Sequence, residues 1–157
     1  MGFMCKNILL IVFVVSCELC FGQNSYHTID RRSLDIPDSL SSPSQISSQL
    51  ARSLDSDKDK ARAFYVWIAH NIRYDFEAFK AGTTSTSEEE RMKQMIQERK
   101  AVCQGYSELF LEMCLSQGIE AYLIRGYTKK HDGVNFENSH AWNGIKLDSN
   151  YYCIDVT

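Results

Sequence analysis

Basic side chains are not in excess in this sequence. Its 17 lysines and arginines are outnumbered by 20 aspartates and glutamates, and the formal net charge is −3 at pH 7. A domain that binds nucleic acid through the phosphates would need a basic patch or stripe, so we expect no nucleic-acid partner. Internal repeats are also lacking, and 157 residues leave room for one domain with a sizeable core.

Spacings that are typical of metal sites are missing as well. Ligand-type side chains are present, but no CxxC or HxxxH spacing brings two of them together locally; they are Cys103, Cys114, His131, His140 and Cys153. A zinc site that only the fold assembles is the alternative. We expect the protein to need neither a metal nor an organic cofactor.

No hydrophobic run is long enough to span a bilayer, because the longest, residues 8–15, has only eight residues. Lys6 precedes this run and small residues follow it up to Gly22, a pattern that predicts a signal peptide over residues 1–22. The letters VVSC also resemble a bacterial lipoprotein box, which would leave a lipidated Cys17 at the mature N-terminus. We therefore expect an exported protein, secreted or periplasmic, with a lipid anchor to a bacterial membrane as the alternative.

Half of the six cysteines belong to this leader, namely Cys5, Cys17 and Cys20. An odd number then remains in an exported domain, which predicts at least one free thiol. If that thiol is Cys103, then Cys114 and Cys153 either pair or serve as small buried hydrophobes. Both alternatives stay open.

The order of predicted elements indicates an α+β fold. Residues 33–48 are rich in serine and contain both prolines, a composition that predicts turns and linker. We expect a lead-in over residues 23–43 and then one domain over 44–157. Helices are expected first: a short one around Ile46, Leu50 and Leu54, one over 57–71 capped by Ser56, a charged one over 88–100, and one from Cys103 to Gly118. Strands are then expected over 119–127, 139–147 and 151–156.

Three chemically reactive residues fall at suggestive places in this order. Cys103 opens a helix, where unpaired backbone N–H groups stabilise a thiolate and can bind the oxyanion of a tetrahedral intermediate. A tight hairpin centred on residues 148–149 would pair Leu147 with Asn150, and would put His140 and Asp155 on one face of the sheet as diagonal neighbours. The pattern predicts a Cys-His-Asp triad that attacks an amide carbonyl.

Three segments resemble the transglutaminase-like superfamily, particularly its exported bacterial members: ARAFYVWIAHNIRYD, VCQGYSELFLEMCLSQGIEAYLIRGY and SHAWNGIKLDSNYYCIDVT. The resemblance implies a papain-like fold with a nucleophile-bearing helix packed on an antiparallel sheet. It also implies catalytic roles for Cys103, His140 and Asp155. Two features depart from the family pattern. Ala101 stands where relatives usually have glycine, and relatives generally continue with more strands, which implies a truncated domain or a sheet that ends early.

The triad and the resemblance together predict a thioester-forming thiol enzyme whose substrate is a protein or peptide. We expect a cysteine peptidase or amidase rather than a crosslinking protein-glutamine gamma-glutamyltransferase, because a short domain shields a thioester from water poorly. The alternative is an inactive transglutaminase-like domain that acts as an exported protein-binding module, since members of this superfamily include both kinds.

Overall fold

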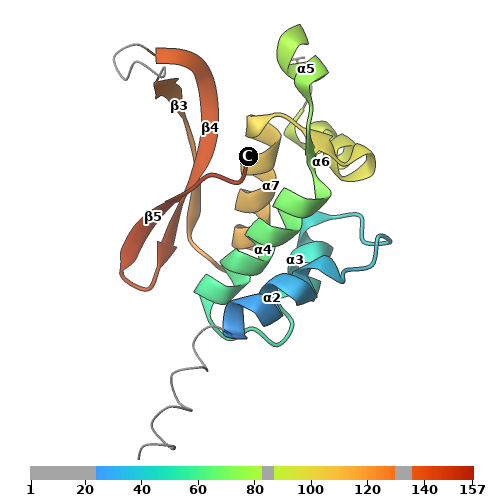
Figure 1. The fold of residues 1–157 in the computed structure, drawn as a ribbon, viewed down its shortest axis with the longest axis vertical. Coiled ribbons are helices and arrows are strands. Elements are labelled where there is room, and N and C mark those ends of the chain that lie inside the picture. Colours follow the sequence, from blue (N-terminus) through green and yellow to red (C-terminus); the bar gives the residue numbers. More distant parts are fainter. Residues whose placement is uncertain (1–23, 83–86, 130–135) are drawn as a thin grey trace, which may run out of the picture.

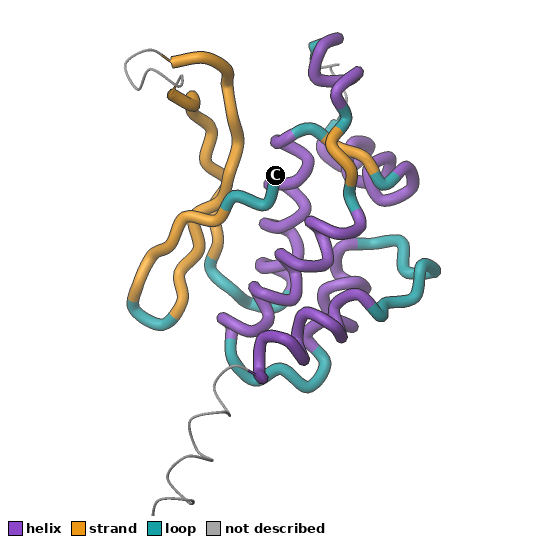
Figure 2. The backbone as a smooth tube through the Cα atoms, in the orientation of Figure 1, coloured by secondary structure: helices purple, strands orange, loops and turns teal. Residues whose placement is uncertain are grey.

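The computed structural model describes residues 24–82, 87–129 and 136–157. Helices gather on one side and a twisted antiparallel sheet stands on the other, with helix α7 (Cys103–Ser116) packed against both (Figure 1). The coloured tube in Figure 2 shows the same division, with the long strands beside the helical layer. The predicted α+β plan is confirmed. Among the described residues, no helix has the length and apolar content needed to cross a bilayer.

Helices α4 (Asp57–Asn71) and α7 form the centre of the core. The hydroxyl of Ser56 accepts a hydrogen bond from the backbone N–H of Asp59, which confirms the predicted cap of α4. Fully buried side chains of α4, α7 and α3 (Pro43–Ala51) pack together. They are Phe64 and Ile68 of α4, Leu109, Phe110 and Met113 of α7, and Ile46 of α3. Gly118 follows α7 with φ +74°, a left-handed conformation that costs glycine little.

The lead-in over residues 23–43 contains a helix that the sequence did not predict. Helix α2 (Asn24–Leu34) packs along α4, burying Ile29 in the core. The guanidinium of Arg62 donates two hydrogen bonds of 2.8 Å to the carboxylate of Asp30 and ties the two helices together. The sequence prediction gave weight to the serines and prolines of 33–48 and missed the periodicity before them.

The sheet has the order β3 (Ala121–Lys129), β4 (Phe136–Leu147) and β5 (Asn150–Ile154). Leu147 pairs with Asn150 and Asn143 with Ile154, so the predicted hairpin register is confirmed. Asp148, at the turn, has φ +55°, which aspartate tolerates better than most residues. Strand β5 ends one residue before Asp155, whereas the sequence predicted a strand through residue 156.

A second, smaller sheet was not predicted. Strands β1 (Arg73–Tyr74) and β2 (Lys100–Ala101) pair in parallel, with Tyr74 opposite Ala101. These strands are two residues long, too short for a hydrophobic pattern to reveal. They connect α4 to the short helix α5 (Phe76–Ala81) and α6 (Glu88–Glu98) to α7, and so fix the approach of the chain to Cys103.

Candidate functional site

His140 and Asp155 are hydrogen-bonded, with His140 Nε2 lying 2.7 Å from Asp155 Oδ2. The other carboxylate oxygen, Oδ1, accepts a hydrogen bond of 3.1 Å from the backbone N–H of Thr157. Between these residues, Val156 is only 4% exposed and packs in the hydrophobic core. The aspartate therefore lies beyond the last strand yet is held on both sides, and it can orient the imidazole.

The imidazole ring is also packed. Trp142, two residues along β4, stacks on His140 with ring centroids 5.9 Å apart and an angle of 27° between the planes. The same indole lies over the backbone of Gly126, where an added Cβ would be only 2.6 Å from Trp142 Cη2. Only glycine fits at position 126 in this arrangement. Since Nε2 is taken by Asp155, Nδ1 is the ring nitrogen left for proton transfer.

Cys103 is the first residue of α7, as predicted, and carries a free, half-buried thiol. No side chain caps this helix, since its N-cap is Val102. The first backbone N–H groups of the helix are therefore not taken by a capping side chain. This local setting suits both a thiolate and a developing oxyanion.

Ala101 packs against the first turn of α7. A Cβ built on Gly105 would lie 2.8 Å from the Cβ of Ala101 and 3.3 Å from the sulfur of Met95. The methyl group at position 101 thus occupies the space above the helix backbone, and the absence of a side chain at Gly105 accommodates it. Close packing between Ala101 and Gly105 therefore accommodates the alanine that departs from the family pattern.

Cys103 and His140 line one cleft, of about 840 Å³. One wall comes from α5, α6 and β2, and the other from β3 and β4; lining residues include Asp75, Phe79, Lys100, Arg125 and Tyr127. The geometry brings the predicted nucleophile and the His140–Asp155 pair to a common space. A thiol, an imidazole held by a carboxylate and a helix N-terminus at one cleft are the parts that acyl transfer requires.

Two aromatic residues, Tyr74 and Trp67, differ in their relation to the nucleophile. Burial raises the pKa of the Tyr74 hydroxyl, and the negative charge of a Cys103 thiolate raises that pKa further. Trp67 lies in the core, 2% exposed, with the guanidinium of Arg99 5.0 Å from its ring centroid. Trp67 is therefore a packing residue, and Tyr74 belongs to the surroundings of the nucleophile.

Glu108 is a functional candidate that the sequence reading missed. It is buried on α7, and its Oε1 accepts hydrogen bonds from Arg91 Nη2 at 2.8 Å and Gln104 Nε2 at 2.7 Å. The bond to Glu108 is the main reason why the pKa of Arg91 is raised. A glutamate within the apolar stripe of the helix was the available signal, because a buried carboxylate needs a cationic partner.

Asn143 fixes the sheet to the nucleophile helix. Its fully buried Nδ2 donates hydrogen bonds of 3.0 Å to the carbonyl of Ser107 on α7 and 3.3 Å to the carbonyl of Tyr122 on β3. Ser107 lies one turn after Cys103, and Asn143 lies three residues after His140. This side chain therefore helps to set the position of the histidine relative to the thiol.

Of the two alternatives for the remaining cysteines, the structure shows no disulfide: Cys114 and Cys153 are free thiols. Cys114 is fully buried, and burial raises the pKa of its thiol to about 12. Cys153 is exposed on β5. The described residues contain no group of three or more His, Cys, Asp or Glu side chains that could hold a metal ion, and His131 lies outside them.

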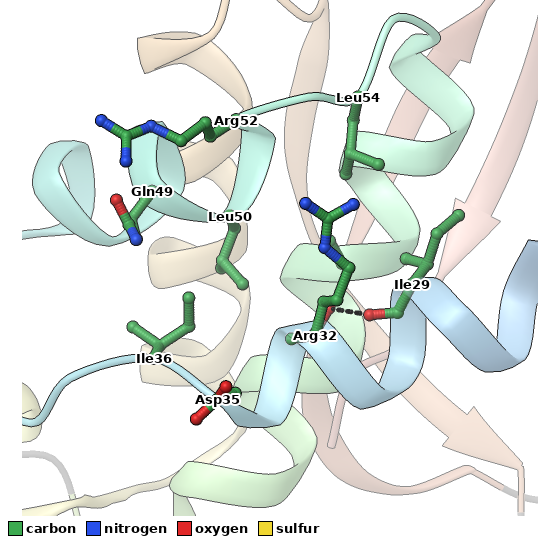
Figure 3. A pocket seen from close by; sticks show the side chains of 10 residues that line it. Ile29, Arg32, Asp35, Ile36, Gln49, Leu50, Arg52 and Leu54 are labelled. Carbon is green, nitrogen blue, oxygen red and sulfur yellow. Dashed lines mark hydrogen bonds between the residues drawn. The ribbon is translucent and has the colours of Figure 1, made fainter.

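A smaller cavity of about 150 Å³ lies between α2, α3 and α4. Ile29, Leu50 and Leu54 line it together with Arg32 and Arg52, and Figure 3 shows the two guanidinium groups pointing in different directions. None of its lining residues is a cysteine or a histidine. Of these two cavities, only the larger is lined by a cysteine and a histidine.

The chain is similar to known proteins of one superfamily. The sequence profile of the transglutaminase-like superfamily matches residues 44–156. The chain is 31% identical over 122 residues to kyphoscoliosis peptidase of Mus musculus, an alignment that covers 72% of this chain. The chain spans only 17% of that relative's length.

Two solved structures share the fold. One is a protein of Cytophaga hutchinsonii provisionally called a cysteine protease, with a TM-score of 0.58 and 22% identity over 73% of this chain and 36% of that one. The other is the periplasmic domain of TgpA from Pseudomonas aeruginosa, with a TM-score of 0.57 and 14% identity over 82% of this chain and 46% of that one. At these identities the likeness concerns the fold.

Proposed function

Because the chain belongs to the transglutaminase-like superfamily, we propose that it is a thiol acyl-transfer enzyme with Cys103 as nucleophile, His140 as general acid and base, and Asp155 as the residue that orients His140. The observation that carries the proposal is the 2.7 Å contact between His140 and Asp155 at the cleft that Cys103 also lines. The fold alone would not name a reaction, since related folds host several.

The first half of the reaction forms a thioester. His140 Nδ1 takes the proton of the Cys103 thiol, and the thiolate sulfur attacks the carbonyl carbon of an amide. The negative charge on the carbonyl oxygen is stabilised by backbone N–H groups at the start of α7, the N–H of Cys103 among them. His140 then returns the proton to the departing nitrogen, the carbon–nitrogen bond breaks, and ammonia or an amine leaves.

The second half decides the reaction type. Water attacks the thioester in a hydrolase, His140 accepts its proton, and the sulfur leaves as the thiolate; in a transferase, a primary amine takes the place of water. We favour hydrolysis, with a protein or peptide as the substrate. The Asp155 side chain is 51% exposed and the Cys103 thiol only half-buried, so water reaches the intermediate readily.

Selective alkylation tests the assignment. Iodoacetamide should modify Cys103 rapidly at mildly acidic pH, and the His140→Ala variant should slow this reaction at least tenfold. Peptide mass spectrometry separates Cys103 from the exposed Cys153, which serves as the internal reference. Labelling of Cys103 at the rate of Cys153, unchanged by His140→Ala, would instead support a non-enzymatic protein-binding module.

Product analysis then distinguishes the reactions. The protein is incubated with a glutamine-containing protein, with and without a primary amine, and the products are analysed by mass spectrometry. Cleaved or deamidated substrate supports hydrolysis, whereas amine-modified substrate supports transfer. Cys103→Ala should abolish every product while leaving the fold intact.

We also propose that the protein acts outside the cytoplasm. The support is the leader-like sequence of residues 1–22, with lipidation of Cys17 as the alternative form of export. Fractionation of cells that express the full chain, with and without Cys17→Ser, tests both forms. An unprocessed chain that remains in the cytoplasm would contradict the proposal.

A further inference from the structure

One guanidinium at the cleft has no part in the chemistry proposed above. Arg125, on β3, lines the same cleft as Cys103 and His140. Its register partner on β4 is Ala141, the residue that follows His140. Tyr127 lies two residues further along, on the same face of β3, and is also an exposed lining residue. Arg125 therefore lies on the sheet wall of the cleft that Cys103 and His140 also line.

Arg125 is not needed to neutralise Glu108. The carboxylate of Glu108 already accepts hydrogen bonds from Arg91 Nη2 and Gln104 Nε2 at 2.8 and 2.7 Å. Arg125 Nη2 is 3.8 Å from Glu108 Oε1, beyond hydrogen-bonding distance. The Arg125 side chain is 63% exposed, so its donors are open to the cleft.

The charges of the cleft are divided between its walls. The charged residues on the helical wall are Asp75, Arg91, Glu98 and Lys100. The carboxylate of Asp75 caps α5 by accepting a hydrogen bond from the N–H of Ala78, and that of Glu98 accepts one from Gln94. On the sheet wall, the described lining residues include no carboxylate, and Arg125 is the permanently charged one.

We propose that Arg125 sets the specificity of the cleft by binding a carboxylate of the substrate next to the reacting amide. A guanidinium presents a planar fork of donors that matches a carboxylate, and no hydrogen bond to Glu108 occupies this fork, because Arg125 lies 3.8 Å from that carboxylate. The substrate class is therefore a peptide with an acidic side chain beside the reacting residue, or one whose terminal carboxylate lies there. The inference rests on the proposed function, but its test requires only binding.

Fluorescein-labelled octapeptides with a central glutamine test the proposal by anisotropy. The flanking residues are glutamates in one set and glutamines in the other, and each peptide is made with a free and with an amidated C-terminus. The Cys103→Ser variant serves as the binding protein, so no turnover occurs. We expect the glutamate peptides to bind about fivefold more tightly than the neutral ones, as for an exposed ion pair.

Substitutions separate recognition from structure. Arg125→Gln should remove the preference and leave the affinity for neutral peptides unchanged, and Arg125→Lys should retain part of the preference. Arg31→Gln, on α2 and not among the cleft-lining residues, is the charge-matched control and should change nothing. A preference that follows the free C-terminus identifies a terminal carboxylate as the ligand, and one that follows the flanking glutamates identifies side chains.

Two results would overturn the proposal: equal affinities for all four kinds of peptide, or an equal loss of affinity for all four in Arg125→Gln. The second would give Arg125 a purely structural role. Neither result would bear on the proposed thiol chemistry, which is tested independently by the effect of His140→Ala on the alkylation of Cys103.

Discussion

Asp155 holds His140 from a position one residue past the end of β5, through the 2.7 Å contact between its Oδ2 and His140 Nε2. The contact depends on two anchors of the terminal segment, the buried side chain of Val156 and the N–H of Thr157 that bonds Asp155 Oδ1. The orientation of the imidazole is therefore set by the hydrophobic core as well as by the sheet.

Asp155→Asn should slow the alkylation of Cys103 by at least about tenfold at pH 6, because the variant keeps a hydrogen-bond acceptor but loses the charge that stabilises the imidazolium. The free energy of unfolding should change by less than about 1 kcal/mol, since the side chain is half exposed. Alkylation reactions quenched at successive times and analysed by peptide mass spectrometry give the rate at which Cys103 is modified.

Asp148→Asn is the matched control for that charge change. Asp148 has φ +55° in the hairpin turn, a conformation that asparagine also tolerates. The control should alkylate as the parent does. An equal loss of rate in both variants would show that net charge, and not the contact with His140, is responsible.

Gly126→Ala should disturb the stacking of Trp142 on His140. The new methyl would lie 2.6 Å from Trp142 Cη2, so the indole must move away from the imidazole. We expect slower Cys103 alkylation and an altered near-ultraviolet circular dichroism signal. At Gly144, an added Cβ would meet Ile124 Cδ1 at 3.4 Å, an ordinary contact, so Gly144→Ala should leave both signals close to the parent's.

Glu108→Gln should destabilise the protein by about 2–4 kcal/mol, because it leaves the guanidinium of Arg91 without its counterion in a part-buried site. Urea unfolding followed by circular dichroism gives the free energy. Glu112→Gln, one turn further along α7 and exposed, should cost less than about 0.5 kcal/mol. Similar losses of unfolding free energy in the two variants would show that the ion pair of Glu108 does not stabilise the fold.

Cys114 should make the protein sensitive to alkali. Burial raises the pKa of its thiol in the folded state from 9.0 to about 12. Below pH 9 the thiol is neutral in both states, and its contribution to stability is fully present. Between pH 9 and 12 the unfolded chain loses the proton while the folded chain keeps it, so the free energy of unfolding falls.

Cys114→Val removes this group while filling a similar volume. The difference in unfolding free energy between the parent and the variant should therefore depend on pH above 9 and be constant below it. Urea unfolding at several pH values measures it. A constant difference up to pH 12 would show that Cys114 ionises as readily in the folded protein as in the unfolded chain.

The sequence predicted those parts of the site that depend on local spacing. The turn at Asp148 sets the register of β4 and β5, and this register brings Asp155 within reach of His140. The cap at Ser56 and the glycine at 118 likewise mark helix ends through local backbone chemistry.

The parts that the sequence reading missed depend on contacts between distant segments. The pairing of Tyr74 with Ala101 joins two-residue strands, which leave no periodic signal. The ion pair of Arg91 and Glu108 joins two helices, and the packing of α2 depends on its contacts with α4. Only the assembled fold shows that Arg125 lines the same cleft as Cys103.

The rate at which iodoacetamide alkylates Cys103, compared between the parent and His140→Ala across pH 5 to 8, tests the central assignment most directly. We expect the parent to react rapidly at the acidic end, and the variant to react only as an ordinary thiol does, faster as pH rises toward a value near 8.5. Superimposable pH profiles for the two proteins would contradict the assignment of Cys103 and His140 as a reacting pair.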